Sequence, residues 1–190
     1  MRKALVAACV CAGCLISAPV LLPAQQIIHA LTGTVSAIDP AAKTITVFQD
    51  TGSAGVYQQW TDSKTRIAFD KHVQAASTAA SQFDKQGAYV IVFYFGGDSD
   101  RTAVALKSLG AGPFQSTQGT VTHYDGRAHA ITVQDESGKT QTFKIDDKTV
   151  AETMMGVTDG SGYHADKGDH VRIVSSIGEG DPIALFVRDL

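Results

Sequence analysis

Cysteine is missing from residues 25–190 of this 190-residue chain. The three cysteines that exist, Cys9, Cys11 and Cys14, all lie in the first 24 residues. If that stretch is removed on secretion, the rest of the chain can form no disulfide and use no thiol as a nucleophile. Zinc sites built from thiolates are excluded for the same reason.

Clusters of basic residues are also missing. Of the 16 Lys and Arg residues, Arg2 and Lys3 lie in the N-terminal stretch, so 14 remain against 19 acidic residues, a formal net charge of −5. Nucleic-acid binding needs Lys and Arg gathered on one surface to neutralise phosphates. We therefore expect no nucleic-acid partner.

Complete enzyme motifs are the third absence. Residues 51–55, Thr-Gly-Ser-Ala-Gly, lack the first glycine of a nucleophile elbow, and residues 178–180, Gly-Glu-Gly, lack the third glycine of a dinucleotide-binding loop. No spacing of Asp and Glu singles out a catalytic pair. The sequence therefore predicts a protein without enzymatic activity and without a cofactor.

The N-terminus has the three-part pattern of a secretory signal. A basic start, Arg2-Lys3, is followed by an uncharged stretch over residues 4–22 and by Ala24 at the expected cleavage point. Two alternatives stay open: an uncleaved anchor, since the apolar stretch approaches the length of a membrane span, and a lipoprotein with Cys14 as its lipidated first residue. Pro19 and Pro23 favour cleavage of residues 1–24. We expect a secreted or periplasmic protein.

One phrase occurs twice in the remaining chain. Ile45-Thr46-Val47 returns 86 residues later as Ile131-Thr132-Val133, and the Gly-Thr-Val that begins at Gly33 returns at the same offset at Gly119. Three later blocks recur in the same order at offsets of 84 and 81 residues. The repetition predicts two related units, residues 31–109 and 117–190, joined by a Gly- and Pro-containing linker over 110–116.

Each unit has the pattern of five strands with one helical segment. In the first unit, β-branched alternation predicts strands over 33–39, 44–50, 56–60, 88–95 and 102–109. Asp70 is placed to cap a helix in which Val73, Ala76, Ala80 and Phe83 repeat at helical steps. The second unit has room for a turn or two of helix at most. This order predicts an all-β chain of two tandem five-stranded OB-like barrels; an SH3-like barrel or a small sandwich is the alternative.

The repeated frame resembles a family of small OB-like domains of unknown function in secreted and envelope proteins of bacteria. In this chain the frame is Gly119-Thr120-Val121, Asp125, Ile131-Thr132-Val133, 168–171 (Gly-Asp-His-Val) and 183–185 (Ile-Ala-Leu). The first unit departs from it, with Gly87-Ala88 in place of Gly-Asp. The resemblance implies a fold and a compartment, and it carries over no catalytic residue.

Two groups of side chains are candidates for a cation site. His123 and His129 are expected at facing ends of the first hairpin of the second unit, with Asp125 or His164 as a third ligand. Asp98 and Asp100 lie in the loop between the last two strands of the first unit, and 178–181 (Gly-Glu-Gly-Asp) is its counterpart. Carboxylate oxygens could hold calcium there, although neither loop has EF-hand spacing. Histidines hydrogen-bonded to water and solvated turn residues are the alternatives.

The fourth strand of the first unit has a large apolar face. Tyr89, Ile91, Phe93 and Phe95 alternate on it, where the second unit has His170, Arg172, Val174 and Ser176. Such a face must be covered, either by the helix or the other unit, or by an envelope protein, a lipid or a second copy.

Taken together, these features of the sequence predict a non-enzymatic binding or structural module of the bacterial envelope. The alternative is a periplasmic cation-binding protein that uses the acidic loops or the histidines.

Overall fold

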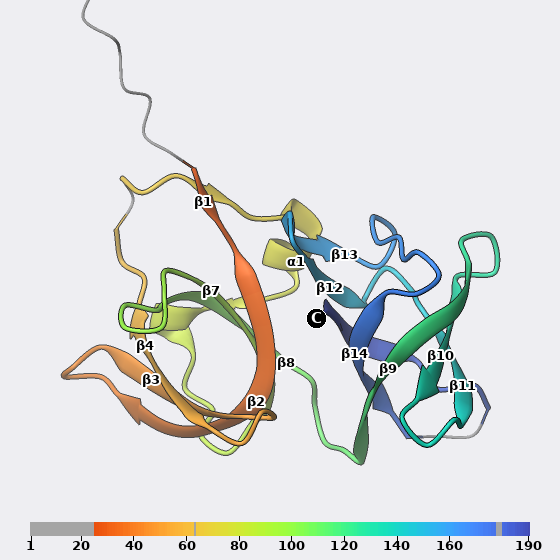
Figure 1. Cartoon of the computed structure of the whole chain (residues 1–190). Coiled ribbons are helices and arrows are strands. Elements are labelled where there is room, and N and C mark those ends of the chain that lie inside the picture. Colours follow the sequence, from red (N-terminus) through yellow and green to blue (C-terminus); the bar gives the residue numbers. More distant parts are fainter. Residues whose placement is uncertain (1–24, 63, 178–179) are drawn as a thin grey trace, which may run out of the picture.

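The computed structural model describes residues 25–62, 64–177 and 180–190, and the predicted signal segment lies outside them. Strands dominate the described residues, in which helix is confined to two short segments, so the predicted all-β class is confirmed. The strands form a six-stranded and a seven-stranded sheet, plus a short two-stranded pair. Figure 1 shows the two larger sheets as curved bodies side by side, joined by the segment between β8 and β9.

The six-stranded sheet belongs to the first unit. Its five main strands are β2 (His29–Asp39), β3 (Thr44–Gln49), β4 (Ala54–Gln59), β7 (Tyr89–Phe95) and β8 (Thr102–Ser108). They pair in the order β4-β3-β2-β7-β8, and a parallel pairing of β4 with β8 closes the ring. Alternate side chains therefore point into a closed interior.

The seven-stranded sheet belongs to the second unit. Its corresponding strands are β9 (Phe114–Asp125), β10 (Ala130–Asp135), β11 (Thr140–Lys144), β14 (His170–Ser176) and β15 (Ala184–Asp189). Their order, β11-β10-β9-β14-β15, repeats that of the first unit, and a parallel bridge between Lys144 and Ile183 joins the two ends. Strand β9 begins three residues before the predicted start of the unit, so the connection from β8 is short.

Local details recur 86 residues apart. Oδ1 of Asp39 accepts hydrogen bonds from two backbone N–H groups of the first hairpin turn, and Oδ1 of Asp125 does the same in the second unit. Each first strand has a bulge, and the hydroxyl groups of Ser36 and Thr122 donate there to the facing carbonyl, both at 3.2 Å. The two units thus share turn and bulge chemistry as well as strand order.

The helical segments differ from the prediction. Asp70 does cap α1, but α1 (Lys71–Ala75) ends after five residues. The chain then forms β6 (Thr78–Ala79), which pairs with β8, and the 3-10 turn η1 (Ala80–Gln82). Thr78 and Ala79 pair with the backbone of β8 at its edge. These two residues therefore form a short strand in the middle of the predicted helix.

The second unit has a strand pair where the first has α1. Strands β12 (Val150–Thr153) and β13 (Gly156–Asp159) form a hairpin, and β12 runs parallel to β15. A two-stranded pair of β1 (Gln26–Ile27) and β5 (Ile67–Ala68) completes the fold. Helix α1 lies against β13 at the boundary between the units (Figure 1).

Three apolar clusters hold the structure together. One fills the first ring around Val92 and Tyr57, and one fills the second around Ile173 and Phe143. The third lies between the units, where Phe93 packs with side chains from both sheets. In the described part of the chain, no helix has the length and apolar character to cross a membrane.

Candidate functional site

The apolar face of β7 is covered by the second unit. Ile91 and Phe93 have no exposed area and share a cluster with Val174 and Phe186 of the second unit. Tyr89 stacks on Phe114 at the start of β9, with ring centroids 4.9 Å apart. Phe95 is half-buried at the edge of the same cluster. In this structure the face is therefore an internal interface, and Ile91 and Phe93 are not open to a docking partner.

Polar contacts surround this apolar interface. Nδ1 of His29 lies 3.2 Å from Oε1 of Glu152, and Nε of Arg188 lies 3.1 Å from Oε2 of the same carboxylate. Nδ1 of His72 lies 3.1 Å from Oδ2 of Asp159. In both pairs a histidine of the first unit meets a buried carboxylate of the second. These contacts link the two units at the edge of the apolar interface.

The two buried carboxylates are shifted in opposite directions. Burial raises the pKa of Glu152 above its usual range, and Arg188 and His29 only partly oppose this effect. The hydroxyl of Ser161 donates to Asp159, and this bond, with the Gly162 backbone N–H, lowers the pKa of Asp159.

The predicted histidine pair lies in an exposed hairpin. His123 faces Thr132 across the hairpin, and His129 follows the turn with a positive φ of 50°. The backbone N–H groups of Ala128 and Arg127 occupy Oδ1 of Asp125 and lower the pKa of that carboxyl. Among the described residues, no group of three or more His, Asp or Glu side chains is arranged to hold a metal ion.

The predicted acidic loop uses its carboxylates internally. Asp98 pairs with the guanidinium of Arg101, and Oδ1 of Asp100 accepts the backbone N–H of Gly97 at 2.8 Å. These contacts shape the turn between β7 and β8. Gly178 and Glu179 of the corresponding second loop lie outside the described residues.

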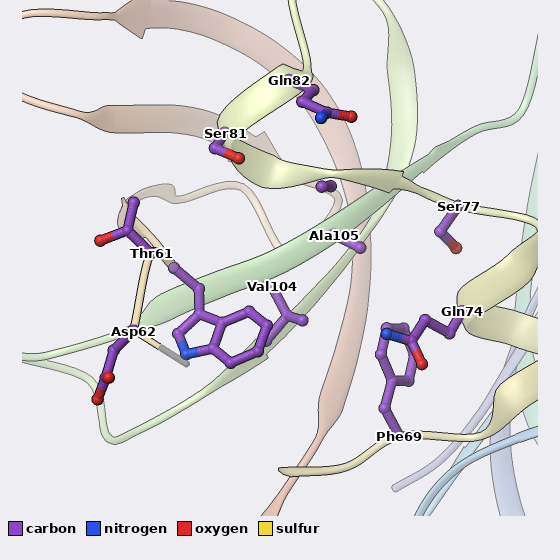
Figure 2. Close-up of a pocket in the computed structure, with 11 residues that line it drawn as sticks. Thr61, Asp62, Phe69, Gln74, Ser77, Ser81, Gln82, Val104 and Ala105 are labelled. Atoms are coloured by element: carbon purple, nitrogen blue, oxygen red, sulfur yellow. The ribbon is translucent and has the colours of Figure 1, made fainter. Parts of the chain in front are cut away.

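The feature that sequence reasoning missed is a hollow on the outside of the first unit. Its volume is about 510 Å³. Strand β8 lies behind it, with Val104 and Ala105 between Thr61 and Asp62 on one side and Gln74 and Ser77 on the other (Figure 2). Ser81 and Gln82 of η1 line a further side. Residues from three segments of the sequence, 60–62, 69–82 and 104–105, thus meet at one place.

The floor of the hollow is apolar and built on the core. Phe69 packs on buried Phe93, with ring centroids 5.0 Å apart. The backbone N–H of Trp60 donates to the carbonyl of Ala103 at 2.8 Å, which ties the end of β4 to β8. The indole Nε1 of Trp60 is buried and has no hydrogen-bond partner within the described part of the chain. A buried donor without an acceptor is uncommon in folded proteins.

The rim of the hollow is polar and is positioned by the short helix. Oδ1 of Asp70 accepts the backbone N–H groups of His72 and Val73, both at 2.9 Å, and so starts the turn that carries Gln74. The hydroxyl of Ser77 donates to the carbonyl of Val73 at 2.6 Å, where the helix ends. The break between α1 and η1 therefore lets both segments border the hollow.

A second hollow borders the first. Its volume is about 580 Å³, and it shares Thr61, Ser81 and Gln82 with its neighbour. Gln59 of β4, Lys43 of the hairpin turn and residues up to Gln86 line the rest. The two neighbouring hollows are together called the unit-one groove.

Little in the sequence indicates this groove. Its lining comes from the end of β4, the α1–η1 segment and β8, and no motif spans them. The one indication is Trp60, the only tryptophan in the chain. Neither a comparison with models of protein families nor a comparison with curated proteins gives a match to this chain.

Proposed function

We propose that this protein is a secreted, non-catalytic binding module of the bacterial envelope, made of two OB-like units. The secretion part of the proposal is supported by the signal-like pattern of residues 1–24. The OB-like part is supported by the ring order of each unit and by the parallel contact that closes it.

The observation that carries the binding role is the unit-one groove. A concave surface with an apolar floor and a few polar groups is the usual form of a ligand site. The face of β7 is taken up by the second unit. The groove is a recess of the first unit that a ligand could enter, while the second unit packs against β7.

The arrangement of charged groups favours binding over catalysis. In the first hollow the one charged residue is Asp62, whose two oxygens accept hydrogen bonds from the Lys64 backbone N–H and the Thr65 hydroxyl. These bonds lower the pKa of Asp62, so this carboxylate is a poor proton donor at neutral pH.

The experiment that tests this role is a ligand screen in which the fluorescence of Trp60, the only tryptophan of the chain, reports binding. The purified chain is titrated with neutral sugars, short peptides, fatty acids, phosphates, Ca²⁺ and Zn²⁺, while Trp60 fluorescence and the melting temperature are followed. A saturable ligand should change the emission and raise the melting temperature, and Ala79→Arg, which adds bulk within the hollow, should abolish both effects. If no compound does so, or if Ala79→Arg binds like the wild type, the binding role of the groove is refuted.

A stabilising effect of either ion in the same screen would support the cation-binding alternative instead. Secretion is tested separately, by N-terminal sequencing of the protein exported from bacteria that express the full-length chain. The proposal predicts a mature N-terminus at Gln25; protein that keeps Met1 or begins at Cys14 would contradict it.

A further inference from the structure

We infer that the unit-one groove binds a neutral oligosaccharide. This inference rests on the proposed function and deepens it, because it names the class of ligand. It starts from the lining of the groove, which is rich in side-chain amides and hydroxyls and poor in cations.

The amides are the first reason. Gln74 and Gln82 border the first hollow, and Gln59, Gln82 and Gln86 border the second. Each side-chain amide offers two donors and one acceptor. A sugar hydroxyl can also donate and accept, so neighbouring hydroxyls on one ring match such an amide. Gln86 is partly committed, because its amide nitrogen donates to the Ser36 carbonyl at 2.8 Å.

Hydroxyl groups extend this polar rim. Ser81 and Thr61 line neighbouring sides of the first hollow (Figure 2) and are shared with the second. Both residues are exposed to solvent. A ligand that passes from one hollow to the other would meet hydroxyls and the Gln82 amide at the junction.

The aromatic floor is the second reason. Trp60 and Phe69 line the first hollow with Val104 and Ala105. The C–H face of a pyranose ring is apolar and can pack on such a surface, while its hydroxyls at the edge reach the rim. The indole N–H of Trp60 has no partner among the described residues, but its nitrogen is buried, so a ligand oxygen could accept from it only after a local rearrangement.

The size of the hollows and the charge of their lining further restrict the chemical class of the ligand. Each hollow lies within the range of about 300–1,000 Å³ that is usual for small-ligand sites. Because the two hollows share Thr61, Ser81 and Gln82 at their border, a ligand of several linked rings could contact both. The charged side chains along the groove are Asp62, Asp84 and Lys43. One cation against two carboxylates disfavours phosphorylated or polyanionic ligands.

The test uses the protein exported from bacteria that express the full-length chain, and a panel of uncharged hexasaccharides: maltohexaose, cellohexaose, xylohexaose and chitohexaose. Binding is measured by isothermal titration calorimetry and by Trp60 fluorescence. Polyuridylate and an uncharged decapeptide serve as competitors of other chemistry. We expect saturable binding of at least one hexasaccharide, with a change in Trp60 emission.

Variants locate the site. Gln82→Ala should weaken binding at least about tenfold, which corresponds to about 1.4 kcal/mol, because it removes the amide shared by both hollows. Gln58→Ala is the matched control, because Gln58 is an exposed glutamine of β4 that lines neither hollow. The Gln58→Ala variant should bind the hexasaccharide with the affinity of the wild type. Circular dichroism confirms that both variants are folded.

Three outcomes overturn the inference. The first is that no hexasaccharide binds at millimolar concentration; the second is that Gln82→Ala and Gln58→Ala bind equally well. The third is that the peptide or polyuridylate binds in the groove while the sugars do not. That third result would mean that the groove binds a ligand of another chemical class. If no compound binds in this test or in the screen above, the proposed binding function is refuted as well.

Discussion

Nδ1 of His29 lies 3.2 Å from Oε1 of Glu152, across the boundary between the two units. Glu152 is 5% exposed, and Arg188 holds its other oxygen from the second unit. A buried carboxylate between two basic side chains of different units makes the relative position of the units sensitive to that one residue.

The pH dependence of stability should therefore change when Glu152 is made neutral. Burial raises the pKa of Glu152 above its ordinary value of 4.5, so the folded chain holds this proton more tightly than the unfolded chain does. The contribution of Glu152 to the free energy of unfolding is complete below the unfolded pKa and declines as the pH rises through the folded pKa. Glu152→Gln should remove that decline.

Urea unfolding between pH 4 and pH 8 measures this effect. Relative to Glu152→Gln, the wild type should lose stability as the pH rises from about 4.5. Glu136→Gln, which changes an exposed carboxylate after β10, should stay within about 0.5 kcal/mol of the wild type. If the wild type instead gains stability relative to Glu152→Gln as the pH rises, the ion pair with Arg188 outweighs the effect of burial on the Glu152 pKa.

The apolar interface between the units can be tested at Phe93. Phe93 has no exposed area and lies in the cluster shared by both units. Phe93→Ala should lower the free energy of unfolding by about 3–5 kcal/mol, because it leaves a cavity that rigid sheets cannot fill. Phe48→Ala is the control: Phe48 is 54% exposed on β3, and its loss should cost no more than about 0.5 kcal/mol. Equal effects in chemical denaturation would mean that the units do not pack through β7.

Two glycines test the repeated scaffold. A Cβ on Gly33 would lie 2.4 Å from the carbonyl oxygen of Phe48, and one on Gly119 would lie 2.2 Å from that of Gln134. Alanine at either position should therefore destabilise the chain by about 1–3 kcal/mol. Gly126→Ala, whose nearest neighbour would be 3.6 Å away, should change the thermal midpoint little. Tolerance of alanine at Gly119 but not at Gly33 would contradict an equivalent role in the two units.

Much of the fold could be predicted because strands and turns are local. The alternation around Ile45 and Ile131 located the second strand of each unit, and Asp39 and Asp125 marked the turns before them. The helix was predicted too long, since periodicity at Ala76 and Ala80 could not show that Thr78 and Ala79 would pair with β8.

The candidate site was beyond sequence reasoning for a physical reason. Gln74 and Gln82 lie on either side of the break in the predicted helix. Trp60 lines the same hollow because the pairing of β4 with β8 brings the end of β4 to this place. The comparison of the two fourth strands was informative in another way. It singled out Ile91 and Phe93, which the structure places where the units meet.

The central claim is that a neutral oligosaccharide binds in the unit-one groove, and nuclear magnetic resonance tests it most directly. Trp60 is the only tryptophan, so its indole N–H gives one isolated signal in a ¹⁵N-labelled chain. On titration with the hexasaccharide that binds best, that signal and the side-chain amides of Gln74 and Gln82 should shift together and saturate at one ligand concentration. Shifts confined to the second unit, or an unchanged Trp60 indole signal at saturation, would contradict the account.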